Sequence, residues 1–496
     1  MRDSLKLMLG LGLALGAVGC GDYFSGPGLS EDPNNVTRLT KPGPLYINIQ
    51  QAVTHEGGTE ILYMQHLAGI ARGAKQGDSY IGSSSGGFFG YGGGGLLDIH
   101  KMEQLARKIG DSLYVGLAKV YEALDIGFIA DLWGDIPYRE AADSTILHPH
   151  FDPQLQVYSD VQIQLDSAIN IFLAARGPSN VGGALDNSEL IYTGRDPAGL
   201  RTVYTAVARS LKARLFMHVA AASLAGVNGA PSAAYDSALK YARAGISSGV
   251  DDFLWFHDAS LTRANTWWGY VSTGDFGPGA AIIEILNRRI AAGVEDTRRI
   301  SFYFTPASDG QYHGFRPTGA TVATSNGTYD GSGTYSNFGA FLDPSLSDGS
   351  FRQPELTYAE TQLVAAEASW HLSCAGCLPT TVVPAAQPFL DAARKNRRYG
   401  SAMFGTAPGT LPASLQNIIE EKYVTLFLNP EVWSDWRRTC LPSLAPAPGT
   451  AAIPARIGYG EITTNPNAPA QTSRLNPNQP TACPVLNYTN SSPLAN

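Results

Sequence analysis

The sequence is poor in charged residues and has no basic block. Charged side chains account for 16% of its 496 residues, whereas about 25% is usual in a globular chain. The net charge of −8 at pH 7, without a positive cluster, argues against nucleic acid as the main partner. No apolar run reaches the roughly 20 residues that cross a bilayer, which excludes a multi-span membrane protein. Hydrophobic residues still make up 44% of the chain, so it can bury a core.

The first twenty residues predict export and lipid anchoring. A short positive start precedes an apolar run over residues 7–19, which has the length of a signal-peptide core. The run ends in small residues before Cys20 and resembles a bacterial lipobox, in which the cysteine is lipidated after cleavage. We therefore expect residues 1–19 to be a signal peptide and Cys20 to be the lipidation site. An ordinary secretory peptide with an incidental cysteine is the alternative.

The other cysteines are few and even in number. They are Cys374, Cys377, Cys440 and Cys483. In an exported protein this count makes two disulfides plausible, with the pairing left open. Cys374 and Cys377 form a C-A-G-C motif, for which a redox site or, with His371, a metal site are the alternatives. The motif follows a helical stretch instead of opening a helix, and a zinc site would need a second ligand pair. We therefore interpret it as a structural disulfide that closes a loop.

Apolar residues recur at helical spacing through most of the chain. In residues 155–173 they fall at steps of three and four and form one stripe. The same period occurs in residues 58–74, 97–132, 198–226, 233–247, 279–292, 355–373 and 412–428. Alternating strand patterns are scarce. The sequence therefore predicts a mainly α fold in which helix pairs stack into one body.

Long aromatic loops separate these segments. Residues 78–95, 250–277 and 301–342 carry phenylalanine, tyrosine and tryptophan among glycine, serine, threonine and asparagine. Loops beyond about 15 residues are uncommon unless they are functional or disordered. Because aromatic residues are depleted in disordered segments, we interpret these loops as candidate functional regions.

Several patterns imitate catalytic signatures. Residues 82–86 satisfy G-x-S-x-G and residues 90–95 satisfy G-x-G-x-x-G, but neither has the strand-and-helix context that its chemistry needs. We interpret both as products of a glycine- and serine-rich tract. Glu420 and Glu421 are neighbours on a predicted helix and point in different directions, so they do not form a facing acid and base pair. No catalytic residue is predicted.

A metal-like H-x-H-x-D pattern occurs at His148, His150 and Asp152. Pro149 lies within it and Pro153 follows it, which favours a turn ahead of the 155–173 helix, with a metal site as the alternative. We expect no metal site and no cofactor.

Residues 131–140 resemble a signature of the SusD/RagB family of outer-membrane lipoproteins. The family string is close to Y-G-D-x-P-Y, and here Trp133 replaces the first tyrosine while Gly134, Asp135, Pro137 and Tyr138 match. Further matches follow in the family's order: Phe151-Asp152, Leu190-Ile191-Tyr192, Ser210-Leu211-Lys212-Ala213-Arg214, Tyr358-Ala359-Glu360, Ala366-Glu367-Ala368, Glu421-Lys422-Tyr423 and Arg437-Arg438-Thr439. The resemblance covers about residues 125–465.

The resemblance implies a SusD-like fold and role. It implies one domain over residues 20–496, a superhelix of tetratricopeptide-like helix pairs with long irregular loops and a few short strands on the ligand-binding side. Residues 20–50 would form a tether and leading segment, and residues 440–496 a loop-rich C-terminal segment. Family members bind nutrients at the cell surface beside TonB-dependent transporters. The expected partner is therefore a SusC-like transporter, and the expected location is the outer membrane, through a lipid anchor.

Most of the motif residues are expected to be structural. Asp135 and Tyr138 fit a turn that ends a helix, since Pro137 cannot continue it. Arg437 and Arg438 are expected to hold helix ends instead of touching a ligand.

Aromatic and amide side chains in the loops are the candidate ligand contacts, because sugar rings lie against aromatic faces and their hydroxyl groups need polar partners. The candidates are Tyr80, Phe88, Phe89, Tyr91, Asn265, Trp267, Trp268, Tyr270, Tyr312, Tyr335 and Asn337. Packing of each ring onto the helical body is the alternative. The leading hypothesis is a non-catalytic protein that binds oligosaccharides. Oligopeptide cargo, a secreted helical glycan hydrolase and a structural scaffold are the other hypotheses.

Overall fold

The described part of the chain is mainly helical. The computed structural model describes residues 40–55, 58–78, 80, 90–143, 145–174, 177, 179, 181, 187–224, 231–260, 262–317, 335–450, 452–457 and 465–467. Its α-helices are α2 (Gly43–Ala52), α3 (Glu60–Tyr63), α4 (Arg72–Asp78), α5 (Leu96–Ile109), α6 (Ser112–Trp133), α7 (Gln154–Ala174), α8 (Pro197–Leu224), α9 (Pro231–Arg243), α10 (Thr266–Ser272), α11 (Ala280–Ala291), α12 (Thr297–Tyr303), α13 (Tyr358–Ser373), α14 (Gln387–Lys395), α15 (Leu415–Thr425) and α16 (Glu431–Thr439). Cys20, Phe88, Phe89 and Cys483 lie outside the described residues, as does the predicted signal peptide.

The strands are short and pair in antiparallel twos within the described residues. They are β1 (Leu67–Gly69), β2 (Phe253–Leu254), β3 (Phe276–Pro278), β4 (Phe304–Thr305), β5 (Asn337–Phe338), β6 (Pro354–Leu356), β7 (Arg397–Tyr399) and β8 (Ala402–Gly405), with 3₁₀ turns at Gly249–Asp251 and Pro384–Ala386. The pairs are β1 with β3, β2 with β6, β4 with β5, and β7 with β8.

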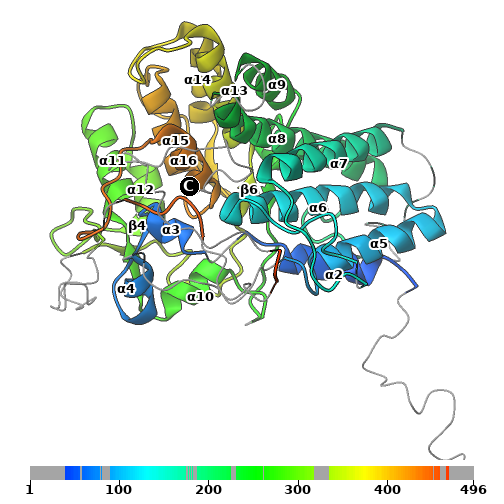
Figure 1. The fold of residues 1–496 in the computed structure, drawn as a ribbon. Coiled ribbons are helices and arrows are strands. Elements are labelled where there is room, and N and C mark those ends of the chain that lie inside the picture. The colour runs from blue at the N-terminus through cyan, green and yellow to red at the C-terminus, as the bar shows by residue number, and fades with distance from the viewer. Residues whose placement is uncertain are drawn as a thin grey trace, which may run out of the picture.

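Successive long helices pack side by side in one continuous row. Each helix from α5 to α9 contacts the next along the chain, and α13 continues the row against α9 and is followed by α14 and α15. Figure 1 shows the row running from α5 and α6 up to α13 and α14, with α10, α11 and α12 on the opposite side of the molecule. The predicted fold of stacked helix pairs with long loops and a few short strands is confirmed.

Two predicted boundaries are wrong. Residues 58–74 contain α3, β1 and part of α4, because β1 pairs with the distant β3 and Gln65 adopts a φ of 57°. Residues 97–132 divide into α5 and α6 at Gly110, whose left-handed φ of 74° ends the first helix. The predicted tether and leading segment, residues 20–50, includes most of α2, which buries Tyr46 and Ile49 in the core.

The segment after α6 is a structural turn. Gly134 ends the helix with a φ of 85°. The Asp135 carboxylate then accepts a hydrogen bond of 2.9 Å from the backbone N–H of Gln154, where α7 begins. The Tyr138 hydroxyl donates to Glu122 at 2.6 Å. The structural interpretation of Asp135 and Tyr138 is therefore confirmed.

The H-x-H-x-D pattern belongs to the same turn. The Asp152 carboxylate accepts from the backbone N–H groups of Tyr138 at 3.0 Å and Arg139 at 2.9 Å. The His150 ring lies 2.9 Å from the Glu140 carboxylate. These contacts support a turn that leads into α7.

A buried carboxylate on α15 joins three other helices. Glu421 accepts hydrogen bonds from Arg289 of α11 at 2.7 Å, from Arg299 of α12 at 2.8 Å and from Arg394 of α14 at 2.8 Å. All four side chains are at most 4% exposed. Burial opposes ionisation of Glu421, but the three guanidinium groups outweigh it and lower its pKa. Both Glu420 and Glu421 therefore serve in ion pairs, the former with Arg288 at 2.8 Å.

A second buried group joins α13, α15 and α16. Lys422 bonds to Asp435 at 2.7 Å and lies 3.4 Å from Glu367. Arg438 bonds to both of these carboxylates. Arg437 donates from Nη1 to a backbone carbonyl oxygen at the end of α6, 2.6 Å away. The prediction that the arginines hold helix ends is confirmed for Arg437, whereas Arg438 joins α13 to α16 through side-chain carboxylates.

His218 of α8 lies between two buried carboxylates. Its Nδ1 is 3.0 Å from Asp131 and its Nε2 is 2.9 Å from Glu431. Burial alone would lower the pKa of His218, but the two negative charges outweigh it and raise the pKa to about 9. Among the described residues this is the one group compact enough to hold a metal ion, with one ligand atom of each residue within 4.8 Å of the others. Since both ring nitrogens bond to carboxylates, we interpret it as an ion-pair triad.

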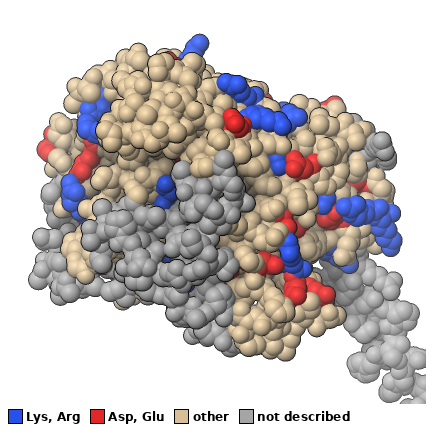
Figure 2. Space-filling view, turned by 45° about the horizontal axis from the view of Figure 1, so that its top comes forward, with Lys and Arg blue, Asp and Glu red and all other residues tan. Residues whose placement is uncertain are grey.

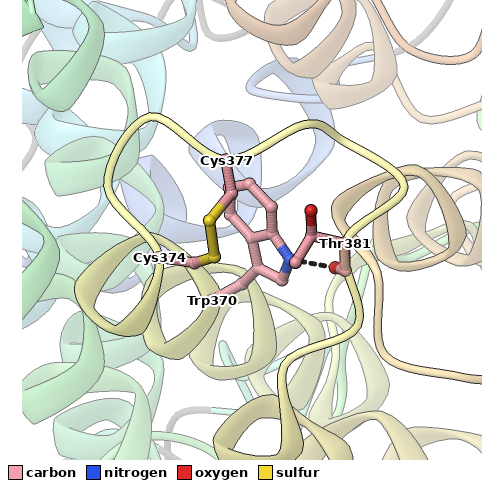
Figure 3. Close-up of a disulfide and its surroundings, with 4 residues drawn as sticks. All are labelled: Trp370, Cys374, Cys377 and Thr381. Carbon is pink, nitrogen blue, oxygen red and sulfur yellow. Dashed lines mark hydrogen bonds between the residues drawn. A yellow bond between two sulfur atoms is a disulfide. The ribbon is translucent and has the colours of Figure 1, made fainter.

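The C-A-G-C motif closes a loop at the end of α13. Cys374 and Cys377 form a disulfide with a Cα–Cα distance of 5.5 Å. Figure 3 shows it beside Trp370, whose indole N–H donates to the Thr381 carbonyl at 2.8 Å. The prediction of a structural disulfide that closes a loop is confirmed for this pair. Cys440 is also disulfide-bonded.

Charged side chains are a minority on one face of the molecule. On the face drawn in Figure 2, positive and negative side chains are interspersed among a majority of uncharged residues. None of the helices in the described ranges combines the length and hydropathy needed to span a membrane.

We expect replacement of Glu421 by glutamine to destabilise the protein strongly. The change would leave three buried guanidinium groups without their common counter-charge, which costs about 3–5 kcal/mol. The control is Arg107→Gln, which breaks an exposed pair with Glu103 on α5 and should cost about 0–1 kcal/mol. Denaturant unfolding measures both free energies. Equal losses for the two variants would contradict the assigned role of Glu421.

Stability should fall as the pH rises from 6.5 to 9. The pKa of His218 is raised in the folded state, so its contribution is complete below its unfolded value and is lost as the pH passes about 9. The full contribution is on the order of 3 kcal/mol. The pH dependence of unfolding should be shallower in His218→Gln than in wild type or in His313→Gln, which changes an exposed histidine. An unchanged slope in His218→Gln would show that the triad does not titrate in this range.

Candidate functional site

Two of the predicted ligand contacts line one hollow beside α11. Tyr312 and Tyr335 belong to the wall of a cavity of about 650 Å³, here called the tyrosine hollow. α11 contributes Ile283, Glu284 and Asn287 to the lining of the same cavity. A hollow of this size is within the range that buries a small ligand.

Backbone pairing and stacking place the Tyr335 ring. The ring stacks on Phe315 with a centroid distance of 3.9 Å and an interplanar angle of 20°. Phe315 is 3% exposed, and its backbone N–H donates to the Pro278 carbonyl at 2.7 Å. Gly277 makes this packing possible, since a Cβ there would lie 2.5 Å from the Phe315 ring. Tyr335 is therefore presented on a rigid support while remaining partly exposed.

Polar groups surround the two tyrosines. Asp309 lies 2.8 Å from the Nε2 atom of His313 and accepts from the backbone N–H of Gln311 at 2.9 Å. That N–H group and His313 lower the pKa of Asp309. The Asn287 amide, from α11, donates to the Tyr312 carbonyl at 3.1 Å. The hollow therefore combines flat apolar faces with carboxylate, imidazole and amide groups.

A second, smaller hollow lies beside strands β3 and β5. Asn337 lines this cavity of about 330 Å³, here called the asparagine hollow, together with Phe276 of β3 and Asp343. Phe276 stacks on Tyr270 at 5.4 Å. Tyr270 therefore supports the wall of this hollow and does not belong to its lining.

Two predicted contacts are buried, and the expectation that they face a ligand is wrong in this structure. Asn265 is 0% exposed and caps α10, where its side-chain oxygen accepts from the backbone N–H groups of Trp267 at 3.0 Å and Trp268 at 3.1 Å. The Trp267 side chain is 1% exposed and lies in the main core. Trp268 is half-buried, and its ring packs close to Gly349.

The described residues of the first predicted loop pack onto the body. The Tyr80 hydroxyl accepts from the backbone N–H of Ala447 at 2.9 Å, and its ring meets Tyr63 edge-on at 5.4 Å. Burial raises the pKa of Tyr80. Tyr91 is half-buried against the main core. Neither lines the two hollows.

The structure adds candidate contacts, residues that line the two hollows and that the sequence did not predict. These are Phe276, Glu284, Asn287, Asp309, His313 and Asp343. Phe276 lies in residues 250–277, an aromatic stretch that the sequence predicts only as a whole candidate region. Glu284 and Asn287 lie on the exposed side of α11. The spacing of apolar residues along a helix predicts which positions are exposed, but it does not distinguish a position that faces a ligand from one that faces solvent.

The chain matches a family model over most of its length. Residues 33–460 match a SusD-like family described as starch-binding and associating with the outer membrane. No curated protein matches the chain. Among solved structures, a SusD homologue from Bacteroides fragilis is similar, with 16% identity and a TM-score of 0.63 over 86% of this chain and 94% of the other.

Two further structures share the fold. A SusD/RagB family protein from Bacteroides thetaiotaomicron has 19% identity and a TM-score of 0.61, over 86% of this chain and 96% of the other. A chitin-binding SusD homologue from Flavobacterium johnsoniae has 19% identity and a TM-score of 0.60, over 90% and 97%. Since the family match covers most of the sequence and the fold agrees with it, the chain belongs to the SusD-like family.

Proposed function

We propose that this protein captures oligosaccharides at the surface of the outer membrane and delivers them, chemically unchanged, to a TonB-dependent transporter. The tyrosine hollow is the observation that carries the proposal, because it places two partly exposed rings beside several hydrogen-bonding side chains. The family's description as starch-binding and outer-membrane-associated supports it. So does the chitin-binding activity named for one structural relative.

The chemistry of the tyrosine hollow suits a sugar. The C–H faces of a sugar ring can lie against Tyr335, whose ring is fixed by Phe315. Hydroxyl groups can then bond to Asp309, His313 or Asn287 around the rings. Such an open site needs only micromolar to millimolar affinity, roughly −8 to −4 kcal/mol.

Lipidation at Cys20 would make weak binding sufficient. A tether holds the binding site close to its transporter and converts transfer into a local step with a high effective concentration. Weak binding also lets the ligand leave quickly, which transfer requires.

The carboxylates of the hollow favour binding over hydrolysis. A glycosidase needs a carboxylic acid that keeps its proton near neutral pH. The pKa of Asp309 is instead lowered by its hydrogen bonds. Glu284 is paired with Arg316. We therefore assign both residues to ligand binding and not to bond cleavage.

Calorimetric titration of the soluble protein, lacking residues 1–20, tests the proposal. Starch-derived and chitin-derived oligosaccharides should bind and should be recovered at their original length. Binding of oligopeptides alone, or release of shorter sugars, would contradict it.

Replacement of Tyr335 or Tyr312 by alanine should weaken oligosaccharide binding by about fivefold or more, because loss of a ring contact costs about 1 kcal/mol. The matched control is Trp267→Phe, which changes a buried aromatic residue outside both hollows and should leave the dissociation constant unchanged. The thermal midpoint of each variant, measured alongside, separates binding from folding. Equal affinity in all variants would place the site elsewhere.

A further inference from the structure

A third hollow lies next to the tyrosine hollow, on the other side of α11. Its volume is about 510 Å³, and it is bounded by α11, by α15 and by the segment 441–444 that follows α16. Its size, like that of the tyrosine hollow, is within the range of sites that bury a small ligand. We call it the α11–α15 hollow.

The geometry of α11 places the two hollows side by side. Successive residues of an α-helix are rotated by about 100°. Ile283 and Asn287 therefore share one face and line the tyrosine hollow, whereas Ile285 and Arg288 share the adjacent face and line the α11–α15 hollow. Glu284 lies at the border between the faces and lines both cavities. Glu284, which is paired with Arg316, therefore joins the linings of the two hollows.

The lining of the α11–α15 hollow is polar, and each of its two carboxylates is paired with an arginine, Glu284 with Arg316 and Glu420 with Arg288. Arg288, whose side chain is 56% exposed, bonds to Glu420 at 2.8 Å. The Gln416 amide donates to the other oxygen of the same carboxylate at 3.2 Å. With the charge of Glu420 neutralised, the remaining guanidinium N–H groups and the amide oxygen can still bond to hydroxyl groups. Leu441 and Pro442 add an apolar wall.

From this juxtaposition we propose that the α11–α15 hollow is a second subsite, filled by the continuation of the oligosaccharide held in the tyrosine hollow. The proposal rests on the proposed function and narrows the substrate class to linear, uncharged polymers long enough to cross Glu284. Short sugars occupy the tyrosine hollow alone, and longer chains gain contacts with Arg288 and Gln416.

The test is a titration of wild-type protein with two neutral series, maltooligosaccharides and chitooligosaccharides, from the disaccharide to the octasaccharide. Affinity for the bound series should rise with chain length by about fivefold or more once the chain reaches the second subsite. Ser443 is exposed and lines the α11–α15 hollow. In Ser443→Trp the indole should fill the hollow and abolish that rise, while the disaccharide binds as it does to wild type.

Two further variants make the result decisive. Ser401→Trp places the same ring at an exposed position between β7 and β8, outside the hollows, and should keep the wild-type length dependence. Gln416→Ala removes one polar group without filling the space and should weaken only the longer sugars.

The possible failures can be told apart. If Ser443→Trp and Gln416→Ala both keep the wild-type rise with length, the second subsite is wrong although the binding function stands. If neither series binds to wild-type protein, the proposed function fails, and the subsite fails with it.

Discussion

The structure depends on one buried carboxylate that is shared by three arginines. Glu421 of α15 fixes α11 through Arg289 and α12 through Arg299, and it reaches back to α14 through Arg394. Because these groups are desolvated, loss of one partner leaves an uncompensated buried charge. The ion pairs therefore constrain how the four helices pack against one another. The other face of α11 is the wall of the tyrosine hollow. An ion-pair cluster whose residues do not line the tyrosine hollow therefore positions one wall of the proposed binding site.

The residues that hold the fold together differ from the residues that line the hollows. The motifs that carry the family resemblance lie in buried ion pairs and turns, as with Lys422, Arg438 and Asp135. The rings and polar groups of the hollows, among them Tyr335 and Asp309, belong to none of these motifs. The resemblance consequently identifies the fold, whereas the ligand has to be inferred from the chemistry of the hollows.

Local pattern predicted the helices well and the exposure of single rings poorly. The apolar stripe of residues 155–173 gave α7 within one residue at each end, since packing and period agree there. The β1–β3 pair was missed because its partners are far apart in the sequence. Trp267 was assigned to the site because it lies in an aromatic loop, although an asparagine directly before Thr266 is the signature of a helix cap. Tyr335 lines the tyrosine hollow and stays a predicted ligand contact, and its support by Phe315 arises only from the tertiary fold.

The central claim is that the tyrosine hollow holds an intact sugar chain. A crystal structure of the protein soaked with a bound oligosaccharide tests this claim most directly. It should show a sugar ring lying flat on Tyr335, hydroxyl groups within hydrogen-bonding distance of Asp309 or Asn287, and an unbroken chain. A ligand bound away from α11, or a cleaved product in the hollow, would contradict it.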